Sequence, residues 1–332
     1  MTNHGNMYGP DFTFLGIERC DLDKPDTFKA ADVVIVGAPI DSGTSHRSGA
    51  KFGPQAIRMG DYLPHDGERP HLALRTDGLK DLKVVDAGDL IMNGGDLVGS
   101  LKLLEAATEK ISKAGAIAVV LGGDHSIASA DVAGIANHRG KGKVSMIHFD
   151  AHADTGADQF GALVGHGTPM RRLIENGHVR GDRFLQLGLR GYWPDDATLN
   201  WMRDQGMRSY EMTEIHHRGL KTVLDESFSI LTDNCDGVFL SVDIDVVDPG
   251  MAPGTGTPEP GGMTSRELLE AVRRICLELP IVGIDVVEVA PPFDSADITA
   301  ILANRVVLEV LSAIALRKKG GTYSPTRNLL DR

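Results

Sequence analysis

The sequence predicts an α/β fold in which a parallel β-sheet is covered by helices on both faces. Short apolar runs alternate with amphipathic stretches over nearly the whole chain, which is the pattern of such folds. The runs lack a strict alternation of apolar and polar residues, as is typical of strands buried on both faces. Glycine or aspartate follows many of the runs, where a strand would pass into a loop.

Seven apolar runs are predicted to form the strands, and most of them are rich in valine and isoleucine. They cover residues 32–36, 83–85, 116–121, 144–149, 184–189, 238–242 and 281–286. Ligands of open α/β sheets bind beyond the carboxyl ends of the strands. The residues that follow these runs are therefore the first candidates for a functional site.

Three amphipathic stretches are predicted to be helices. In the first, leucines recur at helical spacing from Leu97 onward, and Gly115 is suited to the C-terminal cap. In the second, Ser265 is a candidate N-cap, and the helix is expected to end before Pro280. Thr299 is predicted to open the last helix.

The chain of 332 residues is predicted to be a single domain, 1–332, because no repeat, low-complexity tract or Pro/Ser-rich linker divides it. Residues 1–30 are expected to be irregular, and 318–332 to form a mobile tail. No stretch approaches the roughly 20 apolar residues of a membrane helix. The first residues lack the basic and apolar regions of a signal peptide, so we expect none.

The composition is ordinary for a globular protein, with 42% apolar and 24% charged residues. Lys and Arg number 34 against 46 Asp and Glu, which gives a net charge of −12. An acidic chain without a basic block is not expected to bind nucleic acid or an anionic membrane. The three cysteines form no C-x-x-C pair. They favour free thiols in a reducing cytoplasm over a disulfide or zinc–thiolate site.

Three of the predicted strands are followed by acidic residues and histidines. His125 follows one run, Asp150, His152 and Asp154 follow another, and Asp243 and Asp245 follow a third. A spacing of two places the side chains of an extended segment on one side. Unpaired carboxylates at the end of a buried strand would repel one another and lose their hydration, and a bound cation removes both penalties.

These six groups outnumber the ligands of one tetrahedral ion and suit two divalent ions that share bridging carboxylates. Four carboxylates and two imidazoles without a thiolate favour manganese, with nickel, cobalt or iron as alternatives. Two ions about 3.5–4 Å apart can share a water, lower its pKa and supply hydroxide. Each motif alone also fits a capped turn or a polar cluster, but together they predict a hydrolase for a poor electrophile.

The motifs resemble those of the ureohydrolase family, which includes arginases, agmatinases, guanidinobutyrases and proclavaminate amidinohydrolase. The matching segments are 43–49, 52–54, 122–126, 149–154, 166–169, 241–249, 252–258 and 288–291. Gly-Thr-Gly-Thr-Pro at 254–258 and Gly-Thr-Ser at 43–45 are similar to the agmatinase-like branch. The resemblance covers roughly residues 30–315 and implies an arginase-like α/β fold, three-layer α-β-α, with a mostly parallel eight-stranded sheet.

The resemblance also implies how two Mn²⁺ ions, or two Ni²⁺ ions, would be held. One ion would have His125, Asp150, Asp154 and Asp243 as ligands. The other would have Asp150, His152, Asp243 and Asp245. Asp150 and Asp243 would bridge the two ions, and all six ligand positions of the family pattern are present.

The activity implied is hydrolysis of a guanidino compound, of the agmatine or guanidino-acid type, to urea and an amine. Glu288 matches the carboxylate that holds the guanidinium, and a carboxylate pairs well with a planar fork of N–H donors. His166 matches a histidine assigned to proton transfer, which suits an imidazole near neutral pKa. Asp154 and Glu288 would also hold the tetrahedral intermediate. As alternatives, Glu288 could be a surface acid and His166 a loop residue that only shapes the site.

Three further residues are candidates for the substrate tail. Tyr192 and Trp193 either pack on the tail or lie at a subunit contact. Arg47 either pairs with a substrate carboxylate or is structural. The chain departs from the family at Ser295, where relatives often have His or Gln.

Two other functions stay open at this point. One is a nickel-dependent hydrolase of guanidine or a biguanide. The other is a weakly active subunit that supports a paralogue in a hetero-oligomer. By resemblance, a homo-oligomer, a trimer or hexamer, is expected.

Overall fold

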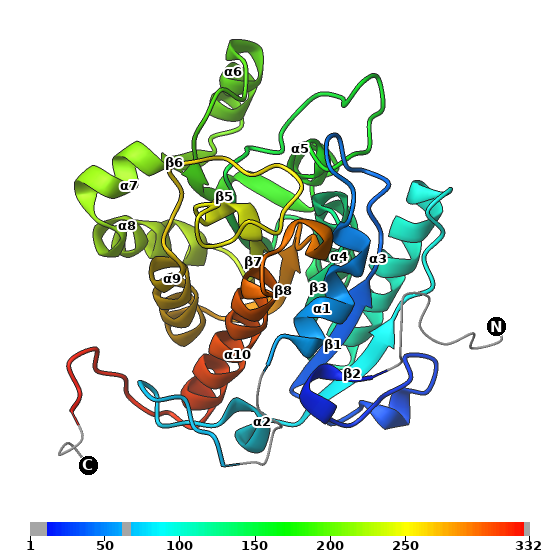
Figure 1. Ribbon diagram of the computed structural model, residues 1–332, viewed down its shortest axis with the longest axis vertical. Coiled ribbons are helices and arrows are strands. Elements are labelled where there is room, and N and C mark those ends of the chain that lie inside the picture. The colour runs from blue at the N-terminus through cyan, green and yellow to red at the C-terminus, as the bar shows by residue number, and fades with distance from the viewer. Residues whose placement is uncertain (1–11, 62–67, 329–332) are drawn as a thin grey trace.

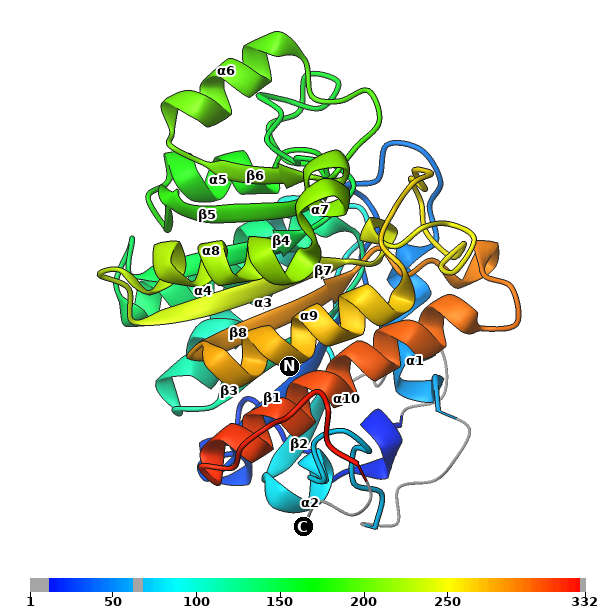
Figure 2. The ribbon, with the colours of Figure 1, turned by 90° about the vertical axis from the view of Figure 1, so that its left-hand side faces the viewer.

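A computed structural model describes residues 12–61 and 68–328. It consists of one eight-stranded sheet between two layers of helices (Figures 1 and 2). The strands are β1 (Val33–Ala38), β2 (Val84–Asp89), β3 (Ile117–Gly122), β4 (Val144–Phe149), β5 (Val179–Leu189), β6 (Arg208–Glu211), β7 (Gly237–Asp243) and β8 (Ile281–Val287). Their order is β2-β1-β3-β8-β7-β4-β5-β6.

All seven strand pairs of this sheet are parallel, so the predicted fold class is confirmed. Seven of the strands overlap the apolar runs of the sequence, although β2 and β5 are longer than predicted. The eighth strand, β6, has no apolar run to predict it, because it is a four-residue edge strand in which only Tyr210 is buried. An edge strand pairs on one side only and needs less apolar surface.

The described part of the chain contains ten α-helices. They are α1 (Gly53–Met59), α2 (Gly78–Asp81), α3 (Leu97–Lys113), α4 (Ala128–Arg139), α5 (Pro169–Glu175), α6 (Asp196–Asp204), α7 (Met212–Arg218), α8 (Leu220–Thr232), α9 (Ser265–Glu278) and α10 (Ile298–Lys318). Helices α8, α9 and α10 lie on one face, and α3, α4 and α5 lie on the other (Figure 2).

Successive residues of a strand point to opposite faces, and the sheet therefore has a core on each side. In β1, Val33 and Ile35 join the core beneath α9 and α10. Val34 and Val36 join the core beneath α3 and α4. Burial on both faces explains why this strand is apolar without a break.

Two predicted helix starts are wrong by one residue. The N-cap of α9 is Thr264, not Ser265, because Thr264 and Glu267 form a capping box. The last helix, α10, starts at Ile298 rather than Thr299. Gly115 directly follows Ala114, the C-cap residue of α3. Its φ of +84° is the left-handed conformation that its predicted capping role requires.

Helix α10 is long and apolar enough to cross a membrane by length and composition, with a mean hydropathy of 1.8. However, 72% of its apolar window is buried inside the protein. Its composition is thus that of a central core helix, which packs against α9. The helix also extends to Lys318, the first residue of the predicted tail.

The predicted irregular N-terminal segment contains two short 3₁₀ turns in its described part, Phe14–Gly16 and Pro25–Thr27. Residues 1–11 and 329–332 lie outside the described residues.

Candidate metal centre

The six predicted ligands and Glu288 follow four strands that are adjacent in the sheet. In the order β3, β8, β7 and β4, these strands are followed or ended by His125, Glu288, the pair Asp243 and Asp245, and the segment 150–154. The carboxyl ends of parallel strands meet at one edge of the sheet. The topology therefore brings together residues that are up to 163 positions apart in the sequence.

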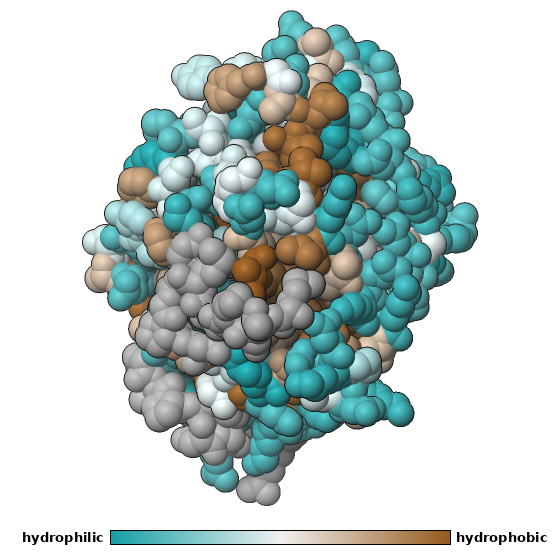
Figure 3. Space-filling model, turned by 90° about the vertical axis from the view of Figure 1, so that its right-hand side faces the viewer, coloured by the Kyte–Doolittle hydropathy of each residue, from teal (hydrophilic) through white to brown (hydrophobic). Residues whose placement is uncertain are grey.

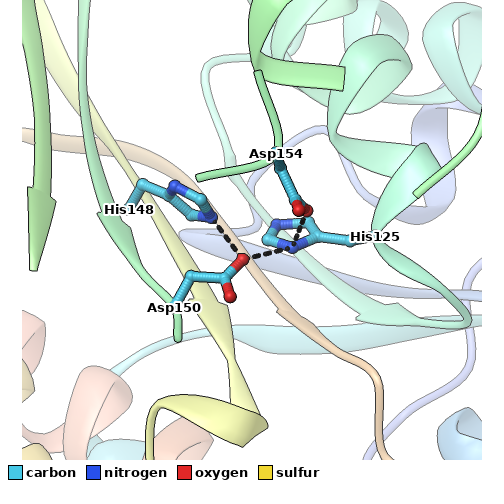
Figure 4. A group of neighbouring side chains, drawn as sticks. All are labelled: His125, His148, Asp150 and Asp154. Atoms are coloured by element: carbon cyan, nitrogen blue, oxygen red, sulfur yellow. Dashed lines mark hydrogen bonds and ion pairs between the residues drawn. The ribbon is translucent and has the colours of Figure 1, made fainter. Parts of the chain in front are cut away.

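The first group of potential ligands surrounds the Nδ1 atom of His125. Carboxylate oxygens of Asp150, Asp154 and Asp243 each lie 3.1 Å from this nitrogen. Figure 4 shows two of these contacts, from Asp150 and Asp154, converging on the ring. A single N–H could serve only one of the three oxygens, whereas a metal ion could accept all four ligand atoms.

The second group surrounds His152. Its Nδ1 lies 3.0 Å from Oδ2 of Asp245 and 3.4 Å from Oδ1 of Asp150. Asp150 thus presents one oxygen to each group. This is the arrangement that a bridging carboxylate needs in a centre of two ions.

The convergence of these side chains arises from turns rather than from an extended segment, contrary to the expectation from the spacing of two. Strand β4 ends at Phe149. Asp154 has a φ of +52°, in the left-handed region that non-glycine residues rarely adopt. Asp245 lies in a 3₁₀ turn, and its N–H donates to Oδ1 of Asp243 at 2.9 Å.

The electrostatics of the group fit a resident cation. Burial and the neighbouring Asp245 and Asp150 raise the pKa of Asp243 well above its usual range. Burial and Asp150 likewise raise the pKa of Asp245. Burial would lower the pKa of His125, but its three carboxylate neighbours raise it well above the ordinary value. Buried acids that are reluctant to ionise beside one another are stabilised when a metal replaces the shared protons.

One residue of the site, His148, was missed in the sequence analysis. It is buried on β4, and its Nε2 lies 2.8 Å from Oδ2 of Asp150 (Figure 4). The side-chain amide of Gln186 donates to its Nδ1 at 3.1 Å, so the proton on Nε2 faces the carboxylate. The available signal was a histidine inside an apolar run, two residues before Asp150. With both of its ring nitrogens engaged, His148 orients Asp150, although it lies within a group of side chains that could hold a metal ion.

Glu288 lies beside this cluster at the end of β8, with a φ of +62°. Its Oε1 accepts a hydrogen bond from the backbone N–H of His125 and lies 2.9 Å from Nδ1 of His166. Its Oε2 is buried and has no hydrogen-bond partner among the described residues. Burial would lower the pKa of His166, but the charge of Glu288 raises it to about 9.

A cavity of about 600 Å³ opens onto part of the ligand cluster and onto His166, whereas Glu288 is not part of its described lining. His152, Asp154, Asp243 and His166 line it, and so does Trp193. Tyr192 is 96% exposed and is not part of the described lining.

Arg47 is held away from the cavity. It donates to the carbonyls of Thr255 and Gly256, and its guanidinium stacks on Phe293 with 4.4 Å to the ring centroid. These contacts favour the structural alternative for Arg47.

Comparisons with known proteins agree with this architecture. The sequence pattern of the Arginase family matches residues 31–313. A guanidinobutyrase of Pseudomonas aeruginosa is 37% identical over 298 residues, which cover 88% of this chain and 89% of that protein. An agmatinase of Cronobacter sakazakii is 38% identical over 289 residues, covering 87% and 89% respectively.

The solved structure of the proclavaminate amidinohydrolase of Streptomyces clavuligerus has a TM-score of 0.81 and 34% identity. The match covers 94% of this chain and 100% of that one. The resemblance drawn from the motifs is thereby confirmed. The chain belongs to the Arginase family.

Proposed function

We propose that the protein is a hydrolase that uses two metal ions to convert a guanidino compound and water into urea and an amine. The observation that carries the proposal is Oε2 of Glu288, a buried carboxylate oxygen without a partner next to the ligand cluster. A guanidinium presents a planar fork of N–H donors, which would satisfy this oxygen. The ligand cluster lies at the same edge of the sheet.

Different residues of the site would carry out different parts of the reaction. A pair of ions held by His125, His152 and the four aspartates would supply a nucleophilic water at neutral pH. Glu288 would bind and orient the guanidinium. His166, on the cavity wall, would carry a proton towards the departing amine, and the Ser45 hydroxyl 2.6 Å from its Nε2 would hold the ring in place.

We propose manganese as the native metal. The donor set has four carboxylates and two imidazoles and no sulfur, which favours a hard divalent ion. Nickel is the alternative to test, because the same ligands would accept it.

The test loads the full-length protein separately with manganese and with nickel, counts the bound ions by elemental analysis and follows urea release. The panel is agmatine, 4-guanidinobutyrate, 3-guanidinopropionate, arginine, guanidine and a biguanide. We expect urea from at least one substrate with a carbon tail in the manganese form. Turnover of only guanidine or the biguanide, and only with nickel, would favour the nickel alternative. No turnover with two ions bound would contradict the proposal and favour a supporting subunit.

We also propose a cytoplasmic location and a homo-oligomer. The three cysteines are free thiols, which suits a reducing compartment. Large apolar side chains such as Phe160 and Leu163 are exposed. Hydrophobic surface gathers in patches on one face of the molecule, amid hydrophilic surface (Figure 3). Such patches are common at subunit contacts, and sedimentation of the purified protein would give the number of subunits.

A further inference from the structure

The cavity has two ends with different chemistry. The inner end is formed by the metal-ligand cluster and His166. The outer end is formed by the loop after β4 and by the segment that leads into α6, in the upper part of the molecule in Figure 1. A guanidino group at the inner end would leave its tail against the residues of the outer end.

The described lining of this cavity contains carboxylates and no lysine or arginine. Two of its acids, Asp154 and Asp243, belong to the ligand cluster, where bound ions would neutralise them. The other two, Asp158 and Asp195, lie at the outer end and have no such partner ions. The charge that a substrate tail meets there is therefore negative.

Three arginines from surrounding segments donate hydrogen bonds to backbone carbonyls and are not part of the described cavity lining, where a substrate tail would lie. Arg47 donates to the carbonyl of Thr255, and Arg172 donates to the carbonyl of Ala157. Arg190 donates to several carbonyls, including that of Glu259 at 2.7 Å. A carboxylate tail would find no described lysine or arginine on the cavity wall.

Asp158 and Asp195 each use one oxygen to shape their own segment. Oδ1 of Asp158 accepts from the N–H of Gly161 at 2.9 Å. Oδ1 of Asp195 accepts from the N–H of Thr198 at 2.9 Å and caps α6. Hydrogen bonds from the backbone N–H and from the side chain of Thr198 lower the pKa of Asp195, so its charge is present at neutral pH. The second oxygen of Asp158 makes no hydrogen bond that the structure records.

Two neighbouring groups complete the wall. Trp193, 70% exposed, offers an apolar ring against which a methylene chain can lie. Thr155 is buried, lines the cavity and has a hydroxyl without a partner in the described part of the chain. An unsatisfied buried hydroxyl in a cavity wall indicates that a polar ligand group or a water belongs there.

We propose that this cavity selects guanidino compounds whose far end is an ammonium group, and that Asp158 and Asp195 determine that specificity. The proposal rests on the function proposed above and adds the class of substrate tail. It favours a guanidino amine over a guanidino acid. The charges are exposed to solvent, so each is expected to contribute modestly, and the preference should weaken as salt increases.

The first test compares three substrates of similar length on the metal-loaded, full-length protein: agmatine, the neutral butylguanidine and 4-guanidinobutyrate. We expect kcat/KM to fall in that order, with agmatine about 10- to 100-fold above 4-guanidinobutyrate at low salt. Equal or better turnover of 4-guanidinobutyrate would overturn this proposal and leave the proposed function intact. No urea from any of the three, or from the wider panel described above, with two ions bound, would overturn both.

The second test removes each charge and keeps the backbone hydrogen bond. In Asp158→Asn and Asp195→Asn the amide oxygen can still accept from Gly161 or Thr198, and asparagine is a good N-cap. We expect each change to lower the ratio of kcat/KM for agmatine to that for butylguanidine about 3- to 10-fold, mainly through KM. An equal loss on both substrates would show a structural role and overturn the assignment.

The matched control is Asp196→Asn. Asp196 is the exposed neighbour of Asp195, carries the same charge and is not part of the described cavity lining. We expect this change to shift the agmatine ratio less than about twofold. A shift as large as that of Asp195→Asn would overturn the assignment to the cavity wall. It would show that the preference for agmatine arises from the electrostatic field of the whole protein.

Discussion

At the scale of single residues, two non-glycine residues of the site have a left-handed backbone conformation. Asp154 and Glu288 have φ values of +52° and +62°. Such conformations are unfavourable on their own and persist where the surroundings enforce them, often at functional sites. Here the N–H of Glu288 donates to the carbonyl of Gly123, which ties the end of β8 to the segment that carries His125. The strained turns aim both carboxylates at the cluster.

The change Glu288→Gln tests the guanidinium assignment. Glutamine keeps the shape and can still accept from the N–H of His125, but it loses the charge that would hold a guanidinium. We expect kcat/KM to fall by about 100-fold or more while two ions stay bound, because buried charged hydrogen bonds are strong. Urea release and elemental analysis measure the two quantities.

The control is Glu278→Gln, an exposed acid on α9 that pairs with Arg274. It should leave both turnover and metal content unchanged. If Glu288→Gln retained full turnover, Glu288 would have no part in holding the substrate.

At the scale of elements, helix α9 is fixed at its start by a reciprocal cap. The Thr264 hydroxyl accepts from the N–H of Glu267 at 3.2 Å, and the Glu267 carboxylate accepts from the N–H of Thr264 at 2.8 Å. We expect Thr264→Ala to lower the free energy of unfolding by about 1 kcal/mol. Thr264→Ser, which keeps the hydroxyl, should lose much less in urea denaturation. Equal losses in the two variants would contradict the cap.

A buried ion network joins α9, α10 and the loop before α2. Glu309 of α10 accepts from Arg273 at 2.8 and 2.9 Å and contacts His71 at 2.8 Å. Burial would raise the pKa of Glu309, but His71 and Arg273 outweigh it and lower the pKa. A carboxyl group whose pKa is lower in the folded state contributes stability above its unfolded pKa. That contribution is lost as the pH falls through the folded value.

The change Glu309→Gln should therefore destabilise the protein in a pH-dependent way. We expect it to lower the free energy of unfolding by about 2 kcal/mol near neutral pH, since it removes charged hydrogen bonds. The difference from the unmutated chain should shrink progressively as the pH falls below about 4 and the carboxyl group becomes protonated. Urea denaturation of the metal-free protein over this pH range measures it. A difference that grows on acidification would contradict the network.

At the scale of the whole molecule, the candidate metal centre lies at the ends of three central strands, β3, β7 and β4. A ligand that binds only the folded chain stabilises it by mass action. At a free metal concentration about 100 times Kd, we expect about 2.7 kcal/mol of added stability and a rise of several degrees in Tm.

The rise in Tm should disappear with a chelator and should be smaller in His152→Ala, which removes one of the expected ligands. Calorimetry with and without manganese measures it. A Tm that does not respond to any divalent ion would contradict the assignment of the cluster. Because the ligands must lose protons to bind, the added stability should also decrease as the pH falls.

The sequence by itself determined the class of fold, seven strands of the sheet and the six acidic and imidazole residues that follow three of them. Apolar runs are local, and so is the spacing of groups such as Asp150 and His152, so both can be read along the chain. Strand β6 and the exact helix starts could not be predicted in this way, because short polar edges and caps carry weak local signals.

Only the tertiary structure decided which groups face one another. The N–H of His125 donates to Glu288, 163 residues further along the chain, and Arg47 is held by the carbonyl of Thr255, 208 residues further along. The acids at the outer end of the cavity, Asp158 and Asp195, come from loops whose paths depend on the packing of β4, β5 and α6. Such contacts are set by the closing of the chain around the sheet, and the order of residues alone does not specify them.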